Sequence, residues 1–167
     1  EAVDALRNSD SAALFMGGHA LREEGLSQAG RIAEATGARP ITETFFTRQQ
    51  RGAGRVETER LPYFGEMAAE HLQGLDTLVI IGSKPPVSFF AYPGKPGWLS
   101  PENANLVQMG DHTFDAIDTL TRIADALGAP SEATKVAQRV QHELEPGPIN
   151  AVELGKIIAN RLPENAI

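Results

Sequence analysis

Hydrophobic positions in this chain alternate between short unbroken runs and longer stretches with helical spacing. Residues 12–16, "AALFM", form an apolar run that ends at two glycines, which is typical of a buried parallel strand. Apolar residues then recur at spacings of three and four from Ala20 to Thr36, which predicts a helix that Gly37 ends. A strand is expected in residues 38–44, "ARPITET". The chain therefore opens with a strand–helix–strand unit.

The same alternation continues toward the C-terminus. Residues 76–82, "DTLVIIG", form the clearest buried strand, and 104–110 predict another. A short edge strand is expected in "VSFFA", and a short amphipathic helix in 152–162. Three helical stripes are predicted from their apolar positions: Phe64, Met67, Ala68 and Leu72; Phe114, Ile117, Leu120, Ala124 and Leu127; and Ala133, Val136, Val140 and Leu144.

This order of elements predicts an α/β fold, with a doubly wound, mostly parallel sheet of five to six strands and helices on both faces. Ligands of such sheets bind at the carboxyl ends of the strands. The loops at 17–20, 44–61 and 82–98 are therefore the places to look for a site.

Composition narrows the classes of partner. The 167 residues suit one α/β domain, and a net charge of −7 gives no basic surface for nucleic acid or an anionic membrane. No apolar run is long enough to cross a membrane. The absence of cysteine excludes disulfides and thiolate metal sites and fits a cytoplasmic protein. Because the chain starts at Glu1 and stops just after a Pro-Glu-Asn turn, we expect a segment of a longer protein.

The glycine turn, residues 17–20, is the first candidate for a ligand-binding site. Backbone N–H groups at a helix N-terminus can bind phosphate, and glycine allows close approach. The turn matches neither Gly-x-Gly-x-x-Gly nor a Walker A motif, so a tight turn without a ligand is an alternative. The candidate nucleotide-binding residues are Gly17, Gly18, His19, Ala20, Gly82 and Ser83.

The long loop at 45–61 is arginine-rich and could clamp phosphate or face solvent. Its arginines are Arg48, Arg51, Arg55 and Arg60, and the acids that could neutralise them are Glu57, Glu59 and Glu66. The histidines show no metal-binding spacing, and only His19 is a candidate ligand contact: His71 and His142 are expected on helix surfaces, and His112 at a helix start. No catalytic motif is visible, and no metal is assigned.

Aromatic residues gather in the proline-rich segment 84–98. If they are exposed, they mark a contact with another domain or subunit, with Trp98 as the best interface candidate; otherwise Phe89 and Phe90 pack inward as an edge strand.

Three stretches together resemble the central domain of thiamine-diphosphate enzymes of the acetolactate synthase and benzoylformate decarboxylase group. They are "MGGHALREEGLSQAGRIAEATGARPITETF", "RLPYFGEMAAEHLQGLDTLVIIGSKPPVSFFAYPGKP" and "INAVELGKIIANRLPENAI". The resemblance implies a Rossmann-like domain of the nicotinamide/FAD-binding type at 12–145. It makes 1–11 a linker from an N-terminal domain, and 146–167 a linker and the first helix of a C-terminal cofactor-binding domain.

The resemblance also implies what the parent enzyme does. The parent acts on 2-keto acids by decarboxylation or carboligation, uses thiamine diphosphate and magnesium, and forms a homodimer or homotetramer. In that family the activating glutamate and the Gly-Asp-Gly motif lie in the outer domains, so the chain itself is expected to hold no cofactor and catalyse nothing. The family's FAD motifs are replaced here by "RLPYFGE" and "SKPPVSFF", which argues against FAD and leaves ADP open. The alternative is a free-standing module that binds FAD or ADP.

Overall fold

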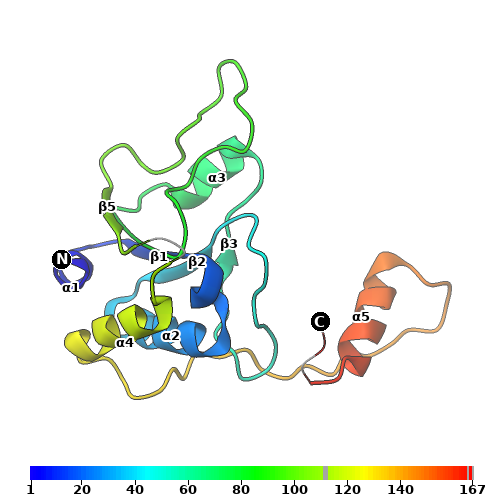
Figure 1. Ribbon diagram of the computed structural model, residues 1–167. Coiled ribbons are helices and arrows are strands. Elements are labelled where there is room, and N and C mark those ends of the chain that lie inside the picture. The colour runs from blue at the N-terminus through cyan, green and yellow to red at the C-terminus, as the bar shows by residue number, and fades with distance from the viewer. Residues whose placement is uncertain (111–112, 165, 167) are drawn as a thin grey trace. The chain divides into compact units, whose positions relative to one another are not determined.

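The computed structural model describes residues 1–110, 113–164 and 166 (Figure 1). The chain divides into two compact units, Glu1–Ala137 and Gln138–Ile167. Among the described helices, none is long and apolar enough to span a membrane.

The first unit is built on a five-stranded sheet in the order β3-β2-β1-β4-β5, with every neighbouring pair parallel. The strands are β1 (Ala12–Met16), β2 (Arg39–Thr42), β3 (Glu59–Arg60), β4 (Thr77–Ile81) and β5 (Asn105–Gln108). Both central strands, β1 and β4, are buried along their whole length. The predicted doubly wound α/β sheet is confirmed.

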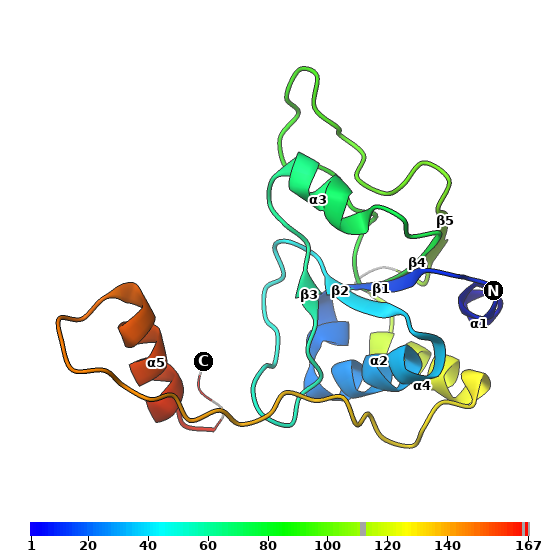
Figure 2. The same ribbon diagram turned by 180° about the vertical axis from the view of Figure 1, so that it is seen from behind.

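Helices cover both faces of this sheet, as Figures 1 and 2 show from opposite sides. One face carries α2 (Glu23–Thr36) and α4 (Ala116–Leu127), and the other carries α3 (Gly65–Leu72). Side chains alternate accordingly. Leu14 and Met16 pack in the cluster with α2 and α4, whereas Ala13 and Phe15 pack in the cluster with α3.

Residues 1–11, for which the sequence predicts a linker, contain the short helix α1 (Ala2–Arg7). It buries Ala2 and Leu6 in the same core cluster as α2 and α4. A helix of six residues is too short to be stable on its own, so packing rather than helix propensity holds it.

The helix predicted from the stripe Ala133 to Leu144 is wrong. Val136 instead forms an isolated antiparallel bridge with Val56, and the Glu34 carboxylate accepts the backbone N–H groups of Thr134 and Lys135. These contacts hold the segment extended along α2. Burial also fails to follow the helical stripe, because Val140 is 60% exposed.

Two smaller expectations are also wrong. Helix α3 begins at Gly65, after Phe64; Phe64 and Met67 are exposed, while Ala68 and Leu72 are buried as predicted. The expected strand in "VSFFA" is reduced to a single bridge between Val87 and Trp98.

The second unit contains α5 (Ala151–Arg161), which matches the helix predicted at 152–162. The Asn150 side chain caps it by accepting from the backbone N–H groups of Val152 and Glu153, each at 3.0 Å. Among the described residues of α5 none is buried. Its apolar side chains therefore have little core of their own.

Candidate functional site

The carboxyl ends of β1, β2 and β4 meet where the strand order changes direction. Gly17 follows β1, Glu43 follows β2 and Gly82 follows β4. The Gly17 N–H donates to the carbonyl of Ile81 at 3.0 Å, and the Glu43 N–H donates to that of Met16 at 3.0 Å. The sheet thus brings three loops together at the switch point, where open α/β sheets bind ligands.

Gly17 and Gly82 lie backbone against backbone at this point. A Cβ on Gly17 would lie 2.7 Å from the Gly82 carbonyl oxygen and also against the Glu43 carboxylate. A Cβ on Gly82 would lie 2.6 Å from the Gly17 carbonyl oxygen, and Gly82 has a φ of +65°. This close approach accounts for both glycines without a ligand.

The glycine turn, residues 17–20, does not lead directly into α2. Gly18–Leu21 form a 3₁₀ turn, η1, in which His19 is exposed and Ala20 is buried. Helix α2 begins only at Glu23, later than predicted, and its first turn carries Glu23 and Glu24. These carboxylates already complement the positive end of the helix dipole and repel a phosphate.

The arginines of the long loop make separate contacts. Arg55 Nη2 lies 3.3 Å from the Glu23 carboxylate, and Arg60 Nε donates to the Thr44 carbonyl at 2.9 Å. The remaining two arginines are exposed: Arg48 and Arg51. Arg55 and Arg60 are therefore held by different groups, Glu23 and the Thr44 carbonyl, and these two arginines do not pair into a phosphate clamp.

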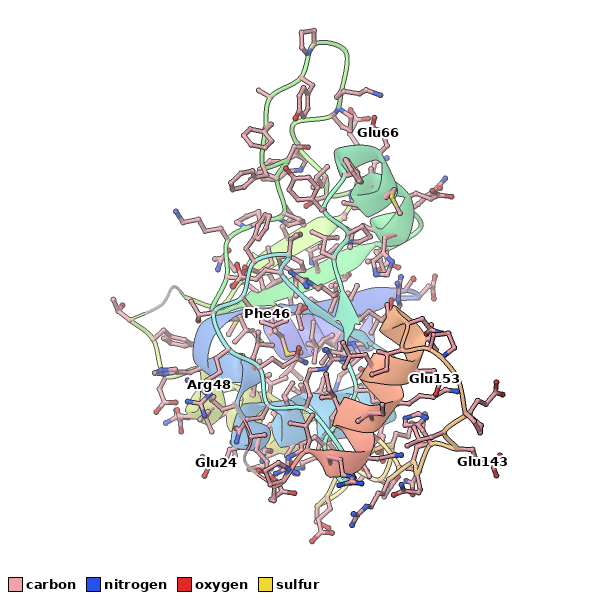
Figure 3. All side chains as sticks on the ribbon, turned by 90° about the vertical axis from the view of Figure 1, so that its right-hand side faces the viewer. Glu24, Phe46, Arg48, Glu66, Glu143 and Glu153 are labelled. Atoms are coloured by element: carbon pink, nitrogen blue, oxygen red, sulfur yellow. The ribbon has the colours of Figure 1, made fainter. Side chains whose placement is uncertain are left out.

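Two of the acids that could neutralise those arginines pair elsewhere. Glu59 forms an ion pair with Arg39, and Glu66 forms one with Lys95. Figure 3 shows Arg48 and Glu66 well apart, on opposite sides of the sheet. The hydrogen bond from Arg39 lowers the pKa of Glu59 below its usual value.

The histidines are not clustered. His71 is half-buried, not a plain surface residue, and its Nε2 lies 3.0 Å from Glu59 Oε2. His142 lies in an extended segment, where its N–H donates to the Asn160 side chain at 2.9 Å. His112 lies outside the described residues. Within the described part of the chain, no group of three or more His, Asp or Glu side chains could hold a metal.

A pocket of about 480 Å³ opens between the loops that follow β2, β3 and β4. Its lining comes from residues 43–45, 61–63 and 82–89, with Phe15 and Leu99. This volume lies in the range of small-molecule sites. Gly82 and Ser83 belong to the lining, whereas residues 17–20 do not. The structure therefore separates the candidate residues into two groups.

Glu43 lies between those two groups, touching Gly17 on one side and lining the pocket on the other. Ser83 Oγ donates to Glu43 Oε2 at 3.4 Å. Burial raises the pKa of this half-buried carboxyl above its usual value. Sequence reasoning missed Glu43, although an acid directly after the second strand is where dinucleotide-binding folds place the residue that binds ribose.

An aromatic surface runs from the pocket over the loop between β4 and β5. Neighbouring rings along it contact one another at centroid distances of 4.7–5.9 Å, and its members are Phe45, Tyr63, Phe64, Phe89, Phe90 and Tyr92. Phe89 is 62% exposed and Phe90 49%, so the inward-packed edge strand is not what forms. Trp98, 54% exposed, lies on the same loop.

Sequence comparison finds this chain similar to part of a longer protein. The chain is 41% identical over 162 residues to the Mycobacterium tuberculosis protein named "Putative acetolactate synthase large subunit IlvX". The match covers 97% of the chain and 31% of that protein. The chain is thus homologous to a domain-sized segment of it, which confirms the resemblance, and spans about a third of this relative's length. No protein-family profile matches the chain.

Two solved structures share the fold. One is a thiamine diphosphate-dependent 4-hydroxybenzoylformate decarboxylase from Rhodococcus jostii RHA1, with a TM-score of 0.67 and 18% identity over 99% of this chain and 34% of that one. The other is a putative thiamin diphosphate-dependent enzyme from Mycobacterium smegmatis, with a TM-score of 0.64 and 18% identity over 98% of this chain and 34% of that one. At this identity they establish the fold alone.

Proposed function

We propose that the chain is the central, structural domain of a thiamine-diphosphate-dependent, acetolactate-synthase-like enzyme that acts on 2-keto acids. The parent would decarboxylate or ligate its substrate, with the thiamine cofactor supplying the electron sink. Residues 12–145 would form the central domain, and 146–167 the start of the next. The 41% identity that extends over 97% of the chain carries this proposal.

The residues of this chain do not fit the thiamine cofactor itself. Magnesium in such sites is held by oxygen ligands, and the described residues bring no three acidic or histidine side chains together. The sequence also contains no Gly-Asp-Gly. The chemistry would therefore reside in other domains, and this chain would contribute no catalytic residue.

The glycine turn would act as scaffold rather than as a nucleotide site. A phosphate placed there would meet Glu43 beside Gly17 and the two glutamates of the first turn of α2. Gly17, Gly18 and Gly82 then serve close packing of the β1 and β4 loops, and neither FAD nor ADP is bound.

The outer part of the aromatic surface, Phe90 and Tyr92 together with Trp98, does not line the pocket and would contact another domain of the same chain or a second subunit of a homodimer or homotetramer. Exposed rings in this density are unusual on a bare surface. Trp98 is 54% exposed and Tyr92 60%, and neither lines the pocket, so both suit such an interface.

Calorimetric titration with FAD, ADP and NAD separates the scaffold from the alternative nucleotide-binding module. No heat of binding is expected from any of the three nucleotides. Micromolar affinity for one of them, abolished by Gly18→Val, would favour the module instead.

The gene sequence around this segment tests the parent enzyme directly. We expect a glutamate-bearing strand upstream and a Gly-Asp-Gly motif downstream in the same reading frame. If both are absent from the full-length gene product, the proposed parent activity is wrong even though the fold stands.

A further inference from the structure

The pocket between the β2 and β4 loops combines an apolar aromatic wall with one carboxylate. Three of its side chains are rings in mutual contact: Phe45 to Phe89 at 4.9 Å between centroids, Phe45 to Tyr63 at 5.7 Å and Tyr63 to Phe89 at 6.3 Å. All three are more than 40% exposed, so their faces are available to a ligand.

The Glu43 carboxylate has no cationic partner within 4.0 Å among the residues that the structure describes. In that part of the chain, its side-chain hydrogen bond is the long one donated by Ser83 Oγ at 3.4 Å. A half-buried carboxylate without a counter-charge is costly, which is why its pKa is raised. A bound cation would relieve that cost.

Lys84 is the other charged group in the pocket lining, and its positive charge repels a cation. It is exposed, however, so that water and salt screen its charge more effectively than that of half-buried Glu43. The net charge of −7 on the whole chain adds a weak attraction for cations.

We propose that this pocket is a binding site for a small organic cation that carries a flat apolar group. The cationic end would lie at the Glu43 carboxylate, and the flat group would stack among the aromatic rings. Aromatic faces attract cations through the negative potential of the ring, and this attraction grows where water is excluded. This site is separate from the scaffold role and does not depend on it.

Three ring compounds of the same size but different charge test this assignment: benzamidine, a cation at neutral pH, neutral benzamide and anionic benzoate. Each is titrated into the 167-residue chain and followed by two-dimensional amide NMR. Benzamidine is expected to shift the amides of 43–45, 82–84 and 87–89 saturably, and to bind at least tenfold more tightly than the other two.

Matched variants locate the charge that carries this preference. Glu43→Gln should lower benzamidine affinity at least tenfold and leave benzamide affinity unchanged. Glu132→Gln, an exposed acid outside the pocket, should change neither. Lys84→Met should strengthen benzamidine binding about two- to fivefold, and because this side chain is exposed the variant tests the assignment even if Glu43→Gln fails to fold.

The assignment is overturned if benzoate or benzamide binds as tightly as benzamidine, or if folded Glu43→Gln binds benzamidine like the parent chain. It is also overturned if none of the three compounds gives a saturable shift, or if ADP shifts these amides and benzamidine does not. None of these results bears on whether the chain is part of a thiamine-dependent enzyme.

Discussion

The two sides of the Glu43 side chain differ sharply in how closely they are packed. On the glycine-turn side, the β1 and β4 loops touch backbone to backbone and leave no room for a methyl group. On the pocket side, loops from the same sheet edge stand apart and enclose about 480 Å³ among aromatic rings. The same sheet edge therefore offers a closed position where nucleotide folds bind phosphate and an open one beside it.

Because of this difference, the fold alone does not indicate which ligand this sheet edge binds. The strand order is that of a nucleotide-binding sheet, but Glu43 and mostly apolar side chains occupy the switch point. The pocket, rather than the glycine turn, is where a small molecule has space.

The strongest test of the closed side is Gly17→Ala. The added methyl would lie 2.7 Å from the Gly82 carbonyl oxygen, which is backbone and cannot rotate away. We expect a loss of about 2 kcal/mol in the free energy of unfolding, measured by urea denaturation. Gly97→Ala, where a Cβ meets nothing within 4 Å, is the control and should change stability little. Equal stability of the two variants would show that the turn is not closed.

The open side should tolerate the loss of a whole ring. Phe89→Ala removes contacts with Phe45 and Phe90, but the side chain is already 62% exposed. We expect destabilisation of about 1 kcal/mol in the same urea experiment. A loss as large as that of a core phenylalanine, more than about 3 kcal/mol, would mean that the rings form a second core rather than an open wall.

The sequence predicted the closed side well and the open side poorly. The runs at 12–16 and 76–82 have no polar residue in their centre, so they could only be buried strands, and the glycines after them marked the turns. The pocket depends on Glu43, which looked unremarkable beside an arginine-rich loop. Its position directly after the second strand is the one signal that the sequence offers, whereas the pocket and its aromatic wall depend on loop conformations that sequence spacing does not contain.

The wrong helix at 133–144 has a similar cause. Its apolar spacing is helical, but Val136 forms a bridge with Val56, and the Glu34 carboxylate accepts the backbone N–H groups of Thr134 and Lys135. Contacts from residues roughly a hundred positions away outweighed local propensity.

A smaller effect on stability is predicted for the charge of Glu43, which lies at the boundary between the two sides. Because burial raises the folded-state pKa of Glu43 above its unfolded value, ionisation of this group costs stability, and the cost appears as pH rises from below the usual pKa of a glutamate to above the raised one. Glu43→Gln should therefore be more stable than the parent by about 0.5 kcal/mol at pH 7, a figure kept small by partial exposure.

Unfolding measured from pH 3.5 to 7.5 checks this sign. The advantage of the glutamine variant should fade at the acidic end of the range, where Glu43 is protonated. An advantage that grows toward acid would contradict a carboxyl whose pKa is raised.

The smallest effect is expected at the exposed residue of the glycine turn. His19→Ala removes a side chain in η1 that faces solvent, so stability should change by less than about 0.5 kcal/mol. Calorimetric titration with ADP should be silent for both His19→Ala and the parent. A measurable ADP affinity that the substitution removes would return the glycine turn to the role of a nucleotide site.

The position of β1 in the sheet has a consequence for how the chain is made. β1 is an early strand, yet it lies in the middle of the sheet and pairs with β4, whose first residue is Thr77. During synthesis the edge of β1 that pairs with β4 therefore stays unpaired until β4 has left the ribosome. Helix α4, which covers one face of the sheet together with α2, emerges later still. A nascent chain halted before Thr77 exposes an apolar strand, which makes this stage the one at which we expect a chaperone to bind.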